Sequence, residues 1–355
     1  MNTIVTNSKI LYTLTSLCRT DYENVNKSQL IDIMNHTEFP WDRFLSVVNR
    51  QKIVGIVYKS LSEMKLLHLV PYRVASAIKY IYLATTKRNQ VLMDELITIL
   101  TAFKEEEIDI RPLKGSVLLD LIYTDYGTRT LNDLDFFVSK NDLKRLPKIM
   151  NNLGYIQGEY NVNDKTLTEL SREDKLMWKV KMFNLPPFCK IHPEPTVDII
   201  SIDFTFGLSF SDNKDINEKI LSTYSILNNK KTLSNIDFFI HLCTHLYKEA
   251  SNEAWENFAQ DINLIKFCDV REYYYFLSQK IDNDDIISRV NELGVEKAFS
   301  FSILYSSILY NDNNLIKLLE RINYSKYNFQ EVYTQNNEIN KIKLNSVSES
   351  ILLVK

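Results

Sequence analysis

The segment RPLKGSVLLDLIYTDYGTRTLNDLDFFV, residues Arg111 to Val138, places a glycine turn and an acidic pair between apolar runs. Both ends of the segment have the apolar character of short strands, and residues 116–126 have the spacing of a helix. Asp133 and Asp135 stand where the second apolar run begins, a place where a strand normally buries its side chains. The segment therefore predicts a strand–helix–strand unit with two aspartates that need an explanation.

Glycine and proline are concentrated around this segment. Five of the seven glycines and six of the eight prolines fall between positions 111 and 210. Because these residues mark turns, we expect strands and tight connections in the middle third and helices in the flanks. The strands are expected at residues 108–114, 134–139, 155–160, 175–183 and 196–206, with helices at residues 116–126 and 140–154 between them.

The flanks repeat apolar residues at helical spacing. Such patterns occupy residues 41–64, with a break near Gly55, and residues 73–107, 236–250, 254–268 and 314–327. The chain after about Gln330 is polar and weakly patterned, and its final ESILLVK fits a helix tip, a strand or a frayed tail. The sequence thus predicts an α+β fold, in which a mixed sheet with helices lies between two helical regions.

Composition and charge exclude several classes of protein. The 355 residues are 45% hydrophobic and 25% charged, which is ordinary for a soluble globular protein. A net charge of −3 argues against bulk binding to nucleic acid or to an anionic membrane. No apolar run is long enough to span a bilayer, and the N-terminus does not resemble a signal peptide. The four scattered cysteines predict free, buried thiols and a cytoplasmic location.

The acidic pair has the pattern of a metal site. Side chains alternate along a strand, so Asp133 and Asp135 should point to the same side, where their charges repel each other. Divalent cations between such carboxylates would relieve the repulsion and clamp a phosphoryl group, and carboxylate oxygens suit Mg²⁺ or Mn²⁺. The alternative is structural, with Asn132 and Asp133 simply ending a turn.

Two neighbouring features favour the metal interpretation. Lys114, Gly115 and Ser116 lie between a strand and a helix, where a glycine lets backbone N–H groups approach a phosphate. Such a turn is also common without a ligand. Asp203 is embedded in the apolar strand pattern SIDFTF, which is typical of a third ligand or a base, although a solvated side chain is the alternative.

These motifs resemble a known family. The order of GS turn, DxD and later strand acid is that of the nucleotidyltransferase superfamily, and LKGSVLLDLIYTDYGTRTLNDLDFFVS followed by LGY resembles the bacterial family of uncharacterised nucleotidyltransferases. The segments WDRFLSVVNRQKIVGIVYKSL, ISIDFTFGL and FFIHLCTHLYKEA…FAQDINLI resemble its flanking parts, so the likeness runs from about Trp41 to Gly294. Thr205 stands where the family commonly has histidine. Asp198 is a rival third acid, and the resemblance favours Asp203 because the residues around it match.

Other side chains have weaker claims to the site. Lys114 and Arg129 are the best candidates to face a triphosphate, with an ion pair to the aspartates as the alternative for Arg129. His241 and His245 are four residues apart on one helix face, a spacing that suits zinc, but the glutamate of HExxH is missing, so helix packing is preferred. The resemblance alone suggests that His245 or Asp261 contacts the nucleotide or the acceptor.

The resemblance implies transfer of a nucleoside monophosphate from an NTP to an acceptor hydroxyl, with release of pyrophosphate. Asp133, Asp135 and Asp203 would hold Mg²⁺ or Mn²⁺, and the acceptor would be a small molecule, a peptide or a protein. We expect four parts: a helical region at residues 1–104, a nucleotidyltransferase core at residues 105–212, a helical domain at residues 213–330 and a tail at residues 331–355. Two alternatives remain: a DxD-dependent glycosyltransferase that uses a nucleotide-sugar, and a non-catalytic nucleotide-binding partner protein.

Overall fold

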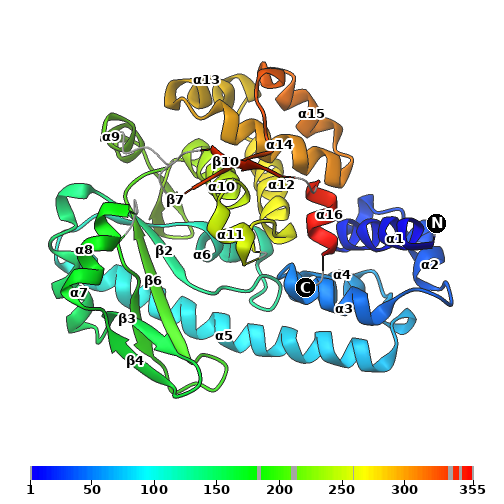
Figure 1. Cartoon of the computed structure of the whole chain (residues 1–355), viewed down its shortest axis with the longest axis horizontal. Helices are drawn as coiled ribbons and strands as arrows, with labels where there is room; N and C mark the ends of the chain where they lie inside the picture. Colours follow the sequence, from blue (N-terminus) through cyan, green and yellow to red (C-terminus); the bar gives the residue numbers. More distant parts are fainter. Residues whose placement is uncertain are drawn as a thin grey trace. The chain divides into compact units, whose positions relative to one another are not determined.

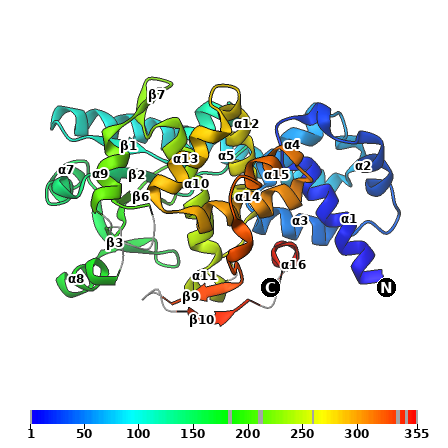
Figure 2. The same cartoon turned by 90° about the horizontal axis from the view of Figure 1, so that it is seen from above.

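The chain folds into two compact units, which we call the sheet unit and the helical unit. In the computed structural model, the residues described are 2–181, 185–208, 214–258, 260–334, 339–343 and 346–353. The sheet unit comprises Lys87–Thr124 and Leu131–His241. The helical unit comprises Met1–Thr86, Asp125–Thr130 and Leu242–Lys355. Figures 1 and 2 label most of the helices and strands of both units.

The sheet unit is built on a mixed six-stranded sheet in the order β1-β2-β6-β5-β3-β4. Strands β2 and β6 pair in parallel, whereas the other neighbouring strands pair antiparallel. The strands are β1 (Ile110–Pro112), β2 (Leu134–Val138), β3 (Ile156–Asn161), β4 (Thr166–Glu169), β5 (Phe188–Ile191) and β6 (Ile199–Thr205). A second, two-stranded sheet pairs β7 (Ser225–Leu227) with β8 (Lys230–Thr232). The α+β fold predicted from the sequence is confirmed.

Alternation along β2 and β6 separates an apolar face from an acidic one. Phe136 and Phe204 are register partners whose rings stack with centroids 5.5 Å apart. Phe103, near the end of α5 (Tyr72–Glu105), covers this face with its ring centroid 5.6 Å from that of Phe204. Asp135 and Asp203, which are also register partners, therefore project from the opposite face.

The remaining helices of the sheet unit lie between its strands along the chain or follow the last of them. The helix after β1 consists of α6 (Lys114–Leu118) and a π-helical turn (Leu119–Tyr123). A short 3₁₀ turn and α7 (Leu146–Asn152) connect β2 to β3, and the expected helix at residues 140–154 takes this form. Helices α8 (Arg172–Lys181) and α9 (Lys214–Ser222) complete the unit, together with the first part of α10 (Asn235–Ala250).

The helical unit is a packed set of helices with one small sheet. Helix α14 packs against α12 and α15, and α1 packs against α2, α4 and α16. The helices are α1 (Asn2–Leu17), α2 (Lys27–Met34), α3 (Trp41–Arg50), α4 (Val54–Glu63), α11 (Glu253–Asn257), α12 (Leu264–Ser278), α13 (Asn283–Leu293), α14 (Glu296–Tyr310), α15 (Asn313–Leu319) and α16 (Val347–Leu352), with strands β9 (Glu331–Tyr333) and β10 (Ile339–Ile342). No described helix is both long enough and apolar enough to cross a membrane.

One predicted strand is wrong. Residues 175–181 of the stretch expected as a strand belong to helix α8, while Met182 and Phe183 lie outside the described residues. Ser171 accounts for the helix, because its hydroxyl oxygen accepts a hydrogen bond from the backbone N–H of Asp174 at 3.0 Å, as an N-cap does. The alternation in KLMWKVK has the period of a strand, but this local signal at the helix start outweighs it.

The expected break near Gly55 is also misplaced. Helix α3 ends at Arg50 and α4 begins at Val54, so Gly55 lies inside a helix and the break is made by residues 51–53. Gly55 is needed for a close approach, since a Cβ there would come within 2.0 Å of the Gly127 carbonyl oxygen. The helix expected at residues 254–268 divides into α11 and α12. All four cysteines are buried and free, as expected.

Candidate functional site

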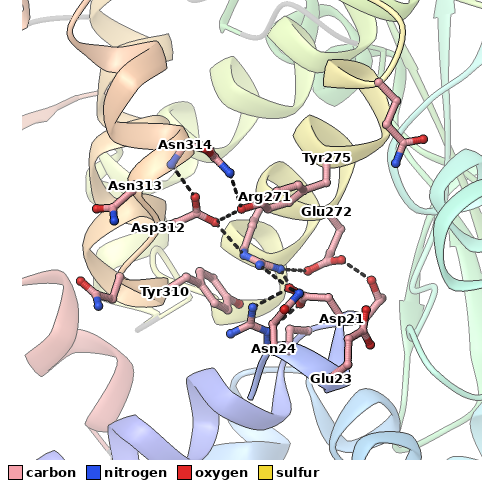
Figure 3. Close-up of a pocket in the computed structure, with 14 residues that line it drawn as sticks. Asp21, Glu23, Asn24, Arg271, Glu272, Tyr275, Tyr310, Asp312, Asn313 and Asn314 are labelled. Atoms are coloured by element: carbon pink, nitrogen blue, oxygen red, sulfur yellow. Dashed lines mark hydrogen bonds and ion pairs between the residues drawn. The ribbon is translucent and has the colours of Figure 1, made fainter. Parts of the chain in front are cut away.

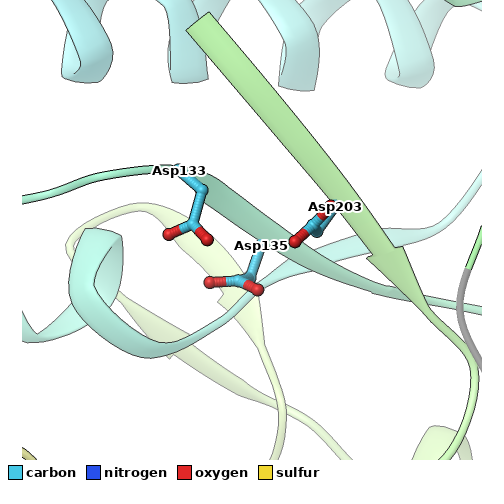
Figure 4. Close-up of side chains that lie close together, drawn as sticks. All are labelled: Asp133, Asp135 and Asp203. Carbon is cyan, nitrogen blue, oxygen red and sulfur yellow. The ribbon is translucent and has the colours of Figure 1, made fainter. Parts of the chain in front are cut away.

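Three aspartates converge in the sheet unit (Figure 4). Asp133 directly precedes β2, Asp135 lies within β2, and Asp203 lies opposite Asp135 on the parallel strand β6. Each contributes a carboxylate oxygen to a group whose atoms all lie within 4.8 Å of one another. The parallel register is what joins residues that are about seventy positions apart in the sequence. The expected acids are thus brought together, and their oxygens form a donor set that hard divalent cations prefer.

The pKa of Asp203 is raised, in part because the three carboxylates lie close together. Burial removes water from this side chain, and the negative charges of Asp135 and Asp133 add to the effect, so its pKa rises to about 7. Lys114 acts in the opposite direction without cancelling these influences. The site therefore holds more negative charge than its own lysine compensates.

Lys114 supplies a positive charge directly to the cluster. Its Nζ donates to Asp135 Oδ1 at 2.6 Å, and the two side chains are 20% and 8% exposed. Burial lowers the pKa of Lys114, but Asp135 and Asp133 outweigh that effect and the pKa is raised overall. The backbone of Lys114 has φ +49°, a left-handed conformation that costs a non-glycine residue energy. This strained turn places the ammonium group against the acids at the start of α6.

Gly115 and Ser116 form the buried first turn of α6, directly after Lys114. The Ser116 hydroxyl donates to the Leu113 carbonyl oxygen at 3.0 Å. The Leu113 N–H in turn donates to the Asp135 carbonyl oxygen at 2.9 Å, so the turn is tied to the strand that carries the acids. The sequence turn that was expected to face a phosphate therefore lies beside the three carboxylates.

Arg88 and Asn89, on α5, bind the backbone of the segments that lead into β2 and β6. The sequence alone did not identify these two residues. The Arg88 guanidinium donates to the carbonyl oxygens of Leu131 (2.8 Å), Asn132 (3.1 Å) and Thr196 (3.3 Å). Asn89 is fully buried, and its Oδ1 accepts from the Leu131 N–H at 3.0 Å. These bonds fix the segment before Asp133 and the loop that precedes β6. In sequence, an arginine on a long amphipathic helix has the pattern of a solvated residue.

Replacing Arg88 by methionine is expected to weaken the metal site without touching a carboxylate. The variant loses three charge-assisted hydrogen bonds, which should cost about 2–3 kcal/mol of folding free energy. Loss of such supporting contacts typically lowers metal affinity by about 10–100-fold. Denaturation curves and Mn²⁺ titration measure the two effects. Arg73→Met is the matched control, because Arg73 is an exposed arginine of the same helix. Equal Mn²⁺ affinity in both variants would show that Arg88 does not position the acids.

Four other candidate residues lie outside the cluster of three acids. Arg129 belongs to the helical unit, where its Nη2 pairs with Asp269 Oδ2 at 2.7 Å. His245 and Asp261 also belong to the helical unit. His245 Nε2 is 3.1 Å from a Glu249 oxygen, and Asp261 pairs with Lys343. Asp198, the rival third acid, is exposed in the loop before β6. Among the described residues, only Asp203 completes a group of three metal-ligating side chains with the acidic pair.

Comparison with known proteins identifies a family. The sequence model of a family described as uncharacterised nucleotidyltransferase matches residues 37–311 of this chain, which is well over half of its length. The matched range includes the three aspartates, the turn at Lys114 and the flanking helices up to the end of α14. No curated protein and no solved structure matches the chain.

Proposed function

Since this chain belongs to the family of uncharacterised nucleotidyltransferases, we propose that it transfers a nucleoside monophosphate from an NTP to an acceptor hydroxyl, with Mg²⁺ or Mn²⁺ as cofactor. The observation that carries the proposal is the convergence of Asp133, Asp135 and Asp203 on one face of the sheet. The lysine and the glycine turn beside them support it. The acceptor would be a small molecule, a peptide or a protein.

The residues at the site suit a divalent cation. All three donors are carboxylates, which hard cations prefer over the nitrogen and sulfur ligands that zinc favours. Burial and the negative charges of Asp135 and Asp133 raise the pKa of Asp203, and a cation would neutralise the charge of this group. When bound, the metal supplies electrostatic stabilisation of the phosphates and of the leaving group.

The side chains then have separate roles in the reaction. Asp133 and Asp135 would hold the cofactor, and Asp203 would share it and accept the proton of the acceptor hydroxyl. The oxygen of that hydroxyl attacks the α-phosphorus, and the bond from the α-phosphorus to the bridging oxygen breaks, so that pyrophosphate leaves with that oxygen. Lys114, with the turn at Gly115, would compensate the charge of the triphosphate. Positioning and electrostatics would provide most of the rate.

The proposal is tested by the choice of donor. We would measure thermal stability with each NTP and with several NDP-sugars, in Mg²⁺, Mn²⁺ or EDTA. A ligand at about a hundred times its Kd adds roughly 2.7 kcal/mol, and a chain of this size should gain a few degrees, about 2–4 °C per kcal/mol. A metal-dependent shift with an NTP is expected. A shift confined to NDP-sugars would indicate glycosyl transfer instead, and no shift with any nucleotide would contradict nucleotide binding altogether.

Replacing Lys114 by methionine should change metal and nucleotide affinity in opposite directions. Without the ammonium group, Asp135 Oδ1 loses its 2.6 Å ion pair and becomes available, so Mn²⁺ alone should bind about tenfold more tightly. NTP in the presence of Mn²⁺ should bind at least about tenfold more weakly, since the triphosphate loses a charge partner. Calorimetric titration measures both affinities. Lys144→Met, at an exposed lysine of the same unit, is the control. A parallel fall in both affinities would mean that Lys114 only holds the fold.

A further inference from the structure

The helical unit contains a polar hollow of about 740 Å³, shown in Figure 3. It is formed by the segment after α1, by α12 and by the turn between α14 and α15. Its volume lies within the range of small-molecule binding sites. Its lining contains arginines, carboxylates, carboxamides, a threonine and two tyrosines, but no aliphatic side chain. Such a lining offers an apolar ligand or a lipid chain nothing to bury against.

The floor of the hollow is a built network of charges around Arg271, which is 2% exposed. Its guanidinium donates to both oxygens of Asp21 (3.0 and 2.9 Å), to Glu272 Oε1 (2.5 Å) and to Asp312 Oδ2 (3.1 Å). Arg19 pairs with Asp21 as well, at 2.6 Å. Two arginines thus face three carboxylates, and the floor carries one net negative charge. These bonds hold the charged groups of the floor in fixed positions.

The side chains at the rim of the hollow, unlike those of the floor, make no hydrogen bond or ion pair within the described residues. Glu23, Gln279, Asn311 and Asn313 are exposed and line the hollow. Each carboxamide offers both a donor and an acceptor, and Glu23 adds a second net negative charge to the hollow. The site thus combines a fixed anionic floor with a ring of adaptable hydrogen-bonding groups.

We propose that this hollow binds a small hydrophilic molecule that carries a protonated amine together with hydroxyl groups. The excess of negative charge favours the protonated amine. The three carboxamides can hydrogen-bond to hydroxyl groups, because both kinds of group donate and accept hydrogen bonds. An anion is disfavoured, because both arginines are already paired and Glu23 would repel it. Binding here does not depend on the three aspartates of the sheet unit or on nucleotidyl transfer.

Matched monosaccharides test the charge and the hydroxyl requirements separately. We would titrate the full chain with glucosamine, glucose and gluconate, and with putrescine as an amine without hydroxyl groups, up to about 10 mM. Saturable binding of glucosamine is expected, at least about tenfold tighter than that of the other three probes, and weaker as the salt concentration rises. Glu23→Gln should lower glucosamine affinity about tenfold or more, because it removes the uncommitted charge and keeps the side chain's shape.

Two control variants separate this site from other effects. Glu38→Gln removes an exposed charge elsewhere in the helical unit, and Asp135→Asn disables the proposed metal site. Both variants should bind glucosamine like the wild type, and the second result would hold even if the chain transferred no nucleotide. The proposal would be overturned by the absence of saturable glucosamine binding. It would also be overturned by equal binding of glucose, or by full glucosamine affinity in Glu23→Gln.

Discussion

Replacing Asp135 by asparagine is expected to reduce nucleotidyl transfer by at least about 1,000-fold, which corresponds to about 4 kcal/mol in the barrier. Asp135 is buried and belongs to the group of three carboxylates with Asp133 and Asp203. An amide of the same shape keeps the packing but removes the charge that a divalent cation needs. Metal-dependent stabilisation by NTP should disappear together with activity, as measured by thermal unfolding.

Asp198→Asn is the matched control for this prediction. Asp198 is exposed, precedes the same strand as Asp203, and is not part of the group of three carboxylates. Its variant should keep the NTP-dependent thermal shift and any activity. The opposite outcome, with Asp198→Asn inactive and Asp135→Asn active, would refute the assignment of the three ligands. Circular dichroism of both variants checks that each has folded.

Replacing Asp203 by asparagine should make the metal-free protein more stable while it destroys the metal site. The wild-type carboxyl has its pKa raised to about 7, because burial and the charges of Asp135 and Asp133 penalise its ionised form. Above that pH the ionised Asp203 carboxylate lowers the free energy of unfolding by an amount on the order of 4 kcal/mol. Asparagine carries no such charge. Residues that serve function at the expense of stability behave in this way.

The sign of the pH dependence follows from the same shift. Between an unfolded value of 3.8 and a folded value of about 7, the native state binds the additional proton, so wild-type stability falls as pH rises through this window. The slope from this group approaches about 1.4 kcal/mol per pH unit. Urea denaturation in EDTA at pH 5, 6, 7 and 8 should therefore show a growing advantage of Asp203→Asn. If the free energies of unfolding of the two proteins changed equally with pH, ionised Asp203 would not destabilise the folded state.

Divalent metal should make the wild type more stable than Asp203→Asn. A cation binds the ionised carboxylate, so Mg²⁺ or Mn²⁺ should stabilise the wild type more at pH 8 than at pH 5 and should leave Asp203→Asn unchanged. The same denaturation series with metal in place of EDTA measures the effect. Equal stabilisation of both proteins by metal would place the ion elsewhere.

Short-range patterns were sufficient to predict the acidic face of the sheet. Strand alternation predicted that Asp133 and Asp135 share a side, and the apolar context of Asp203 predicted its place on another strand. The parallel pairing of β2 and β6 places Asp135 opposite Asp203. The position of Lys114 at the start of the helix also follows from local sequence.

Contacts between distant residues could not be predicted in the same way. Arg88 binds backbone carbonyl oxygens, which every residue carries, so no side-chain pattern identifies its partners. Arg129 pairs with Asp269, 140 positions away, and the local motif around Arg129 contains no sign of that partner. In α8, the strand-like alternation of residues 175–181 led to a wrong prediction, because the N-cap at Ser171 begins a helix there. Such errors are expected where local periods conflict with capping.

The polar hollow of the helical unit is a further example. Its residues come from three segments, near positions 19–24, 271–279 and 310–314, and none of these segments contains a recognisable motif. Arg271 lies in a helix rich in tyrosine, where its burial among three carboxylates becomes evident only from the fold. Sites assembled from separate helices therefore require the structure.

Titration with Mn²⁺, followed by electron paramagnetic resonance, tests most directly whether Asp133, Asp135 and Asp203 together bind a divalent cation. The free ion gives a strong signal that is lost on binding, so no acceptor or turnover is needed. We predict saturable Mn²⁺ binding by the wild type that is strengthened by NTP, and its loss in Asp135→Asn and Asp203→Asn but not in Asp198→Asn. Mn²⁺ binding that is absent from the wild type, or that survives in both cluster variants, would contradict the account.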